Sequence, residues 1–156
     1  MKFNDALFKI NLAVLTEYPV AQFYEAQGQL VPTDEESKVD GTIDTAQFKA
    51  IYNYPTEEGQ KTIVGSFDDD LNVKIEVIND IWCEDVIMTP YVPMTADYAI
   101  DLINAKLDLV QIGPGPITLR HQLYPGENEP RYFIGTIKEI HSIKVYSAEI
   151  DADAGK

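Results

Sequence analysis

The sequence has few of the residues on which disulfide-bonded and metal-bound folds depend. Its 156 residues include one cysteine, Cys83, and two histidines, His121 and His141. One cysteine excludes a disulfide within the chain, and it falls short of the Cys and His sets that bind structural zinc. The two histidines also lack the spacing of a helical metal pair. We therefore expect no metal and no cofactor, and a core that is stable without either.

Positive charge is scarce as well. Twelve Lys and Arg residues stand against 26 Asp and Glu residues, which gives a formal net charge of −14. Nucleic acids and anionic membranes both attract proteins through Lys and Arg. We therefore expect no nucleic-acid partner. The acidic excess has two interpretations: a solvated surface that keeps the chain soluble, or an acidic face that meets a basic protein.

Long apolar runs are also missing. No run approaches the roughly 20 residues of a helix that spans a bilayer, so we expect no membrane insertion. The start of the chain carries Asp5 and Lys9 inside its apolar pattern, and it lacks the apolar core and cleavage site of an export signal. We interpret it as the first helix of the fold. The sequence leaves the location open: extracytoplasmic if the family resemblance described below holds and a signal has been removed, and otherwise cytoplasmic.

Familiar catalytic motifs are absent too. The sequence contains no G-x-S-x-G, no phosphate-binding loop and no G-x-G-x-x-G. Cys83 stands beside Glu84 and Asp85, whose charges disfavour a reactive thiolate. His121 alternates with apolar residues, which predicts a structural histidine on a packed face, and His141 is expected in a solvated turn. We therefore expect a protein that is not an enzyme. The alternative, an enzyme that carries no familiar motif, stays open beside the binding roles described below.

A repeated helical pattern is present. Met94–Leu107 matches Met1–Val14 at an offset of 93 residues, and in both stretches the matched apolar residues recur at i, i+3 and i+7. Strand-like segments follow each stretch. The pattern predicts an α+β fold of two helix-plus-antiparallel-sheet units that form an approximate tandem repeat. The first unit covers residues 1–92, with an acidic loop over Pro32–Asp44, and the second, shorter unit covers residues 93–156.

Local signals predict the elements of these units. The first helix is expected over Asn4–Glu17, capped by Asn4 or Asp5, and Thr95 is expected to cap the second helix. A tight turn is expected near Glu139–His141, and the short connections predict antiparallel neighbours. Alternation and turn residues predict strands over residues 20–30, 48–54, 61–67, 71–77, 117–124, 131–137 and 142–150.

Several turn motifs carry a resemblance to a known family. The second unit has Tyr124–Gly126 at a strand end, Pro130–Phe133 in the next strand, and a last strand that closes in Asp151–Lys156 (DADAGK). This resembles the PepSY domain, whose final strand commonly closes in an Asp-Ala-x-x-Gly turn. The first unit resembles it through Tyr18–Pro19, but adds the acidic loop and lacks the closing motif.

The tandem layout is also similar to the architecture of β-lactamase-inhibitor proteins, although those proteins carry disulfides that this chain cannot form. The resemblances imply a non-catalytic module, often extracytoplasmic, that binds or restrains another protein. We therefore expect a non-enzymatic protein-binding or regulatory and inhibitory module of PepSY-like type. The alternative is an acidic interaction protein, of anti-defence or immunity type, that occupies a basic surface of its partner.

Aromatic residues are the candidate binding residues. Four of them, Tyr52, Tyr54, Trp82 and Tyr91, predict an exposed patch for a partner protein, because aromatic anchors dominate binding hot spots. Sheets also use aromatic residues for core packing. The sequence leaves both interpretations open.

Overall fold

The computed structural model describes most of the chain. The described residues are 1–31, 40–79, 94–105, 117–122, 130–136 and 140–151. Trp82, Cys83, Tyr91, the centre of the acidic loop and the end of the closing Asp-Ala-x-x-Gly motif lie outside these ranges.

The described residues form two α-helices, one short 3-10 helix and eight strands. In chain order they are α1 (Phe3–Glu17), β1 (Gln22–Leu30), η1 (Thr45–Gln47), β2 (Lys49–Thr56), β3 (Gly59–Phe67), β4 (Val73–Ile78), α2 (Ala96–Ala105), β5 (Ile117–Gln122), β6 (Arg131–Gly135), β7 (Ile140–Lys144) and β8 (Glu149–Asp151).

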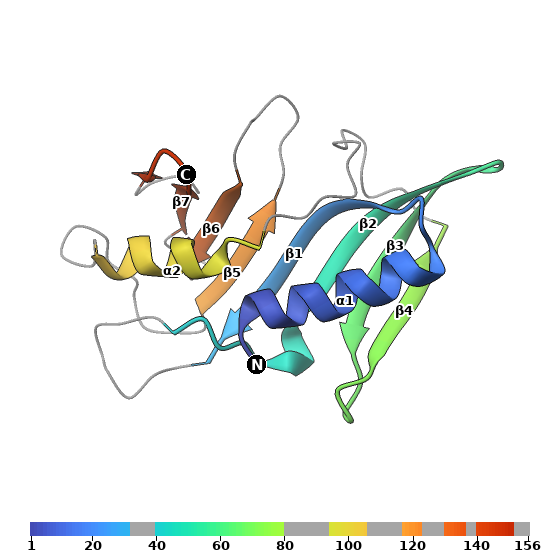
Figure 1. Cartoon of the computed structure of the whole chain (residues 1–156), viewed down its shortest axis with the longest axis horizontal. Coiled ribbons are helices and arrows are strands. Elements are labelled where there is room, and N and C mark those ends of the chain that lie inside the picture. Colours follow the sequence, from blue (N-terminus) through green and yellow to red (C-terminus); the bar gives the residue numbers. More distant parts are fainter. Residues whose placement is uncertain (32–39, 80–93, 106–116, 123–129, 137–139, 152–156) are drawn as a thin grey trace.

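All eight strands belong to one sheet (Figure 1). Their order is β4-β3-β2-β1-β5-β6-β7-β8, and every neighbouring pair is antiparallel. The junction is the pairing of β1 with β5, which runs from Glu25 opposite Gln122 to Leu30 opposite Ile117.

The expected fold class of two helix-plus-sheet units is therefore wrong. In two separate sheets β1 and β5 would each be an edge strand with unpaired backbone N–H and C=O groups. Pairing these two edges satisfies both sets of groups and leaves one continuous sheet. The division of the chain at residues 92 and 93 stays a prediction.

Both helices lie on the same face of the sheet (Figure 1). The predicted apolar stripe of the first helix is confirmed, because all of its members are buried in the core. The second helix contributes residues to the same single core cluster. The buried stripe residues are Phe3, Leu7, Ile10 and Val14 on α1, and Ala96, Ala99, Ile100 and Ile103 on α2.

The two helices are joined at their starts by Asn4. Its Nδ2 donates to the carbonyl of Met94 (3.3 Å), and its Oδ1 accepts from the backbone N–H of Ala96 (3.1 Å). The expected cap of α1 by Asn4 or Asp5 is wrong, since the N-cap residue is Lys2 and no side chain caps it. Asn4 instead satisfies a first-turn N–H of the other helix, which otherwise has no partner within that helix.

The C-terminal hairpin also differs from the expectation. His141 lies within β7 and is 4% exposed, and the turn falls at residues 145–148, with Ala148 at φ 54°. The solvated His141 and the single strand over residues 142–150 are therefore wrong. The turn expected near Glu139–His141 is displaced toward the N-terminus, because β7 already pairs with β6 at Ile140, opposite Gly135, and Glu139 lies outside the described residues. The turn at residues 145–148, which interrupts the expected strand, contains no Gly, Pro or Asn, which are the residues that signal a turn in a sequence.

Close packing of α1 on the sheet depends on Gly65 of β3. A Cβ at this position would stand 2.4 Å from Cγ2 of Ile10 on α1. The glycine therefore sets how near the helix approaches the strand. Gly41, by contrast, has room for a Cβ, whose nearest neighbour would lie at 3.7 Å.

We expect Gly65→Ala to lower the free energy of unfolding by about 1–3 kcal/mol, because overpacking forces the helix or its side chains to shift. In an Ile10→Ala background, which removes Cγ2, the same change should cost less, with a coupling of roughly 0.5–3 kcal/mol. Urea unfolding of the single and double variants measures this. Gly41→Ala is the control and should be nearly neutral. Strict additivity of Gly65→Ala and Ile10→Ala would contradict the packing described.

Candidate functional site

The sheet face opposite α1 and α2 carries no helix among the described residues (Figure 1). Side chains alternate along β1, so that Ala26 and Leu30 are buried toward the helices while Gln27 and Gln29 point the other way. The register extends this alternation across every strand. We call this second face the open face. Its charged members are Glu25, Lys49, Lys74, Glu76, Arg120, Arg131, Lys144, Glu149 and Asp151.

The open face concentrates the few cations of the chain. Among the residues that the structure describes, five of the eight Lys and Arg residues lie on it, compared with four of the fifteen Asp and Glu residues. A protein with a net charge of −14 thus has one sheet face on which positive and negative charge nearly balance.

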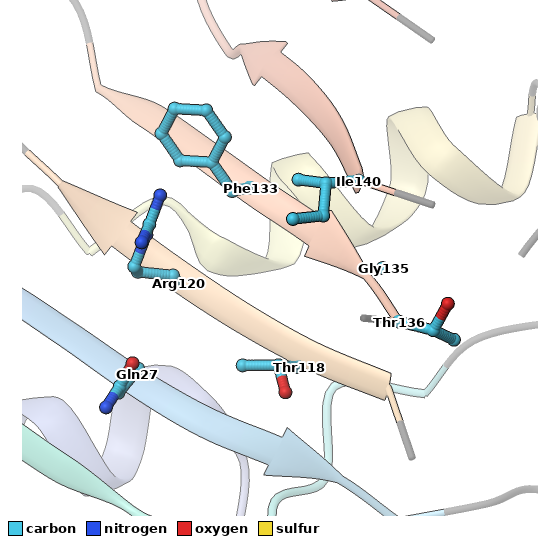
Figure 2. A pocket seen from close by; sticks show the side chains of 7 residues that line it. All are labelled: Gln27, Thr118, Arg120, Phe133, Gly135, Thr136 and Ile140. Atoms are coloured by element: carbon cyan, nitrogen blue, oxygen red, sulfur yellow. The ribbon is translucent and has the colours of Figure 1, made fainter. Parts of the chain in front are cut away.

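A shallow hollow lies in the middle of this face, over β1, β5 and β6 (Figure 2). In the register, Thr118 stands opposite Gly135, and Gly135 stands opposite Ile140. Because the glycine has no side chain, its two neighbours border a gap of about 210 Å³. The residues that line it are Gln27, Thr118, Arg120, Phe133, Gly135, Thr136 and Ile140.

Arg120 and Phe133 border the hollow on the left of the view in Figure 2. They are register partners on β5 and β6, and the guanidinium carbon lies 4.6 Å from the centroid of the ring. This is a cation–π contact, which fixes the guanidinium over the aromatic face. The Nε of Arg120 is buried and has no hydrogen-bond partner among the described residues.

Glu25 is the acidic neighbour of this pair on the open face. Burial raises the pKa of its carboxyl above the ordinary value, and the charges of Arg120 and Lys49 act in the opposite direction. Glu25 itself is half-buried, so its surroundings on the open face are partly excluded from water. A charge introduced there is screened less than one at the rim of the molecule.

The groups around the hollow are suited to binding. Arg120, Thr118 and Gln27 offer hydrogen-bond donors, and Phe133 and Ile140 offer apolar surface. Together these residues suit a bound group that has a hydrogen-bond acceptor at the end of a short apolar stem. Elsewhere in the described ranges, no three His, Cys, Asp or Glu residues are arranged to hold a metal ion. In the same ranges, no helix has the length and apolarity to cross a membrane.

The structure places two of the four predicted aromatic residues, both on β2 and on the helix side. Tyr52 is fully buried, donates its hydroxyl to Oδ1 of Asn11 (3.1 Å), and has a pKa raised by burial. Tyr54 is half-buried, with its ring 5.1 Å from that of Tyr18. Tyr52 is thus a core residue, the second of the two interpretations open at the sequence level. Trp82 and Tyr91 fall outside the described residues, and their binding role stays a prediction.

The sequence reasoning missed Arg120 and Phe133. Arg120 could have been found, because it alternates with buried Leu119 and His121 in a predicted strand and so points away from the core. Phe133 could not, since it stands between the apolar residues Tyr132 and Ile134. An uninterrupted apolar run does not tell which of its members face the core.

His121 lies on the packed face of β5, as its alternation predicted. It is fully buried, stacked on Tyr132 with centroids 4.4 Å apart and 5.5 Å from the ring of Phe23. Neither ring nitrogen has a hydrogen-bond partner among the residues that the structure describes. Burial lowers its pKa to about 3.

Stability should therefore fall in mild acid. The pKa of His121 is lower in the folded chain than its unfolded value of 6.5, so the unfolded chain binds more protons between these two pH values. Its contribution is complete above the unfolded pKa and declines as the pH falls toward 3. From pH 7 to pH 5 this group alone should lower the free energy of unfolding by about 2 kcal/mol.

His121→Phe, which keeps a flat ring in the stack, should remove that part of the pH dependence. Urea unfolding of both proteins at neutral pH and in mild acid measures the difference. Equal losses of stability in the two proteins would show that His121 is not the group responsible.

Comparison with known proteins finds no match to this chain. Neither a family model, nor a curated protein, nor a solved structure matches the chain. The resemblances to the PepSY domain and to β-lactamase-inhibitor proteins therefore stay predictions.

Proposed function

We propose that the chain is a non-enzymatic protein-binding module, and that its partner docks on the open face around Arg120 and Phe133. The observation that carries this proposal is the cation–π pair at the edge of the hollow, in the centre of the open face, on which the described residues place no helix. Arginine and aromatic residues are enriched at the centres of protein interfaces, where a few such anchors supply most of the affinity.

The size of the hollow supports a protein partner over a small molecule. Its volume of about 210 Å³ is below the roughly 300–1,000 Å³ of small-molecule sites. A single side chain of a partner fits such a space. The rest of the partner then lies over the neighbouring strands.

The extent of the open face also suits a protein interface. Neighbouring strands lie about 4.8 Å apart and a five-residue strand is about 17 Å long, so eight strands cover roughly 600 Å². A standard interface buries about 800 Å² on each partner. We keep within this proposal the regulatory or inhibitory role that the PepSY resemblance implies, since covering a partner's surface is how such a face would act.

A second candidate is the acidic interaction protein of anti-defence or immunity type. Exposed carboxylates on the helix side favour it, because Asp5 lies on α1 and Asp97 and Asp101 lie on α2. A basic partner would then meet the helices instead of the open face. The two candidates use opposite faces, so substitutions on one face separate them.

The test is capture of partners from a lysate of the source cells on three immobilised proteins: the wild type, Phe133→Ala and Tyr146→Ala. The control changes an aromatic residue that is 63% exposed on the turn between β7 and β8, away from the hollow. We expect a protein that both the wild type and Tyr146→Ala retain and that Phe133→Ala loses. Loss of a hot-spot aromatic residue costs about 2 kcal/mol or more, roughly a 30-fold loss of affinity.

Two outcomes would contradict the open-face proposal: retention of the same proteins by all three columns, or by none of them. The second candidate predicts the first of these outcomes together with release by moderate salt, because screening weakens contacts between exposed charges. Circular dichroism of each variant checks that the fold is intact.

A further inference from the structure

We infer that the hollow receives a side-chain carboxylate, from an aspartate or glutamate of the partner protein, and that Arg120 is the residue that binds it. This inference rests on the proposed function, because it names the group that the docking partner presents. Three features of the open face support it: the charges around the hollow, the donors of Arg120 and the shape left by Gly135.

Charge is arranged along one row of the register. Lys49 stands opposite Gln27, Gln27 opposite Arg120, and Arg120 opposite Phe133. With strands about 4.8 Å apart, the two cations begin roughly 10 Å from each other, one on either side of Gln27. The acidic residue that acts on both of them is Glu25. Among the described residues, these two cations and one carboxylate leave a local positive excess, in a chain whose net charge is −14.

Arg120 offers donors that suit a carboxylate. Its guanidinium carbon lies 4.6 Å from the centroid of the Phe133 ring, and the planar guanidinium carries a fork of N–H groups that matches the two oxygens of a carboxylate. The Nε is buried with no acceptor among the described residues. A buried donor without an acceptor costs free energy, which an entering carboxylate would recover by accepting one or two charge-assisted hydrogen bonds.

The floor of the hollow fits a short acidic side chain. Gly135 leaves the space between Thr118 and Ile140 open, and Thr118 is exposed at its rim. Phe133 and Ile140 can contact the methylene groups of an aspartate or glutamate while its oxygens reach Arg120. A neutral amide of the same shape would fill the same space but would gain no charge-assisted bond.

The test uses three N-acetylated peptides and the ¹⁵N-labelled full chain. The probes are acetyl-Ala-Glu-Ala-amide, its isosteric Gln counterpart, and acetyl-Ala-Ala with a free C-terminal carboxylate. We expect the Glu peptide to shift the amide signals of Thr118, Arg120 and Phe133 in a saturable way at millimolar concentration. The Gln peptide should bind about tenfold more weakly, since a hydrogen bond between charged groups is worth about 1.5–3 kcal/mol.

Two matched variants test whether Arg120 is the residue that binds the Glu peptide. Arg120→Gln should weaken the binding of the Glu peptide by about tenfold or more. Lys74→Gln removes one positive charge from the same face at the edge strand β4 and should leave binding unchanged. Equal binding of the Glu and Gln peptides, equal effects of the two variants, or no shifts with the Glu peptide would each overturn the inference. Stronger binding of the C-terminal carboxylate would also overturn it. The comparison of the peptides on the wild type needs no variant to fold.

Failure of this inference differs from failure of the proposed function. If the peptides show no preference while Phe133→Ala still loses a captured partner, the open face binds a protein through another group. If the Glu peptide binds while Phe133→Ala and Tyr146→Ala retain the same proteins, the hollow binds carboxylates but the docking proposal fails.

Discussion

The pairing of β1 with β5 is the interaction on which the rest of the structure depends. Six consecutive residue pairs join the strand that follows α1 to the strand that follows α2. Without this pairing, each half of the chain would expose an edge strand and would have to bury the apolar face of its own small sheet. With it, Phe23, His121 and Tyr132 form one group of rings across the junction, and the two helices share one core.

The candidate site is a product of the same junction. Gln27 belongs to β1 and Arg120 to β5, and they face each other because these strands pair. Phe133 joins them from β6, and Gly135 leaves the space that the others surround. Five of the eight described Lys and Arg residues lie on the open face, which gives this face a chemistry different from the rest of the described surface.

The sequence predicted what depends on local periodicity. The apolar stripe of α1, the alternation of β4 and the inward orientation of His121 all follow from spacing of 3.6 or 2 residues. Which sheet edges meet could not be predicted, because Glu25 and Gln122 pair across almost a hundred residues and no local signal specifies that choice. The prediction that Asn4 caps α1 was wrong for the same reason, because its hydrogen-bond partner lies on the other helix. Of the site, Arg120 could be inferred from alternation, but Phe133 lies in an apolar run and the hollow exists only in the paired sheet.

Site-resolved hydrogen exchange of the native protein tests the central claim most directly. If β1 and β5 form the centre of one cooperative sheet, their mutually bonded amides within Glu25–Leu30 and Ile117–Gln122 should exchange only through global unfolding. Their exchange free energies should then equal the free energy of unfolding measured with urea. The account is contradicted if these amides exchange through a smaller opening while the β2–β3 and β6–β7 pairs stay protected, because the two halves would then be separable units.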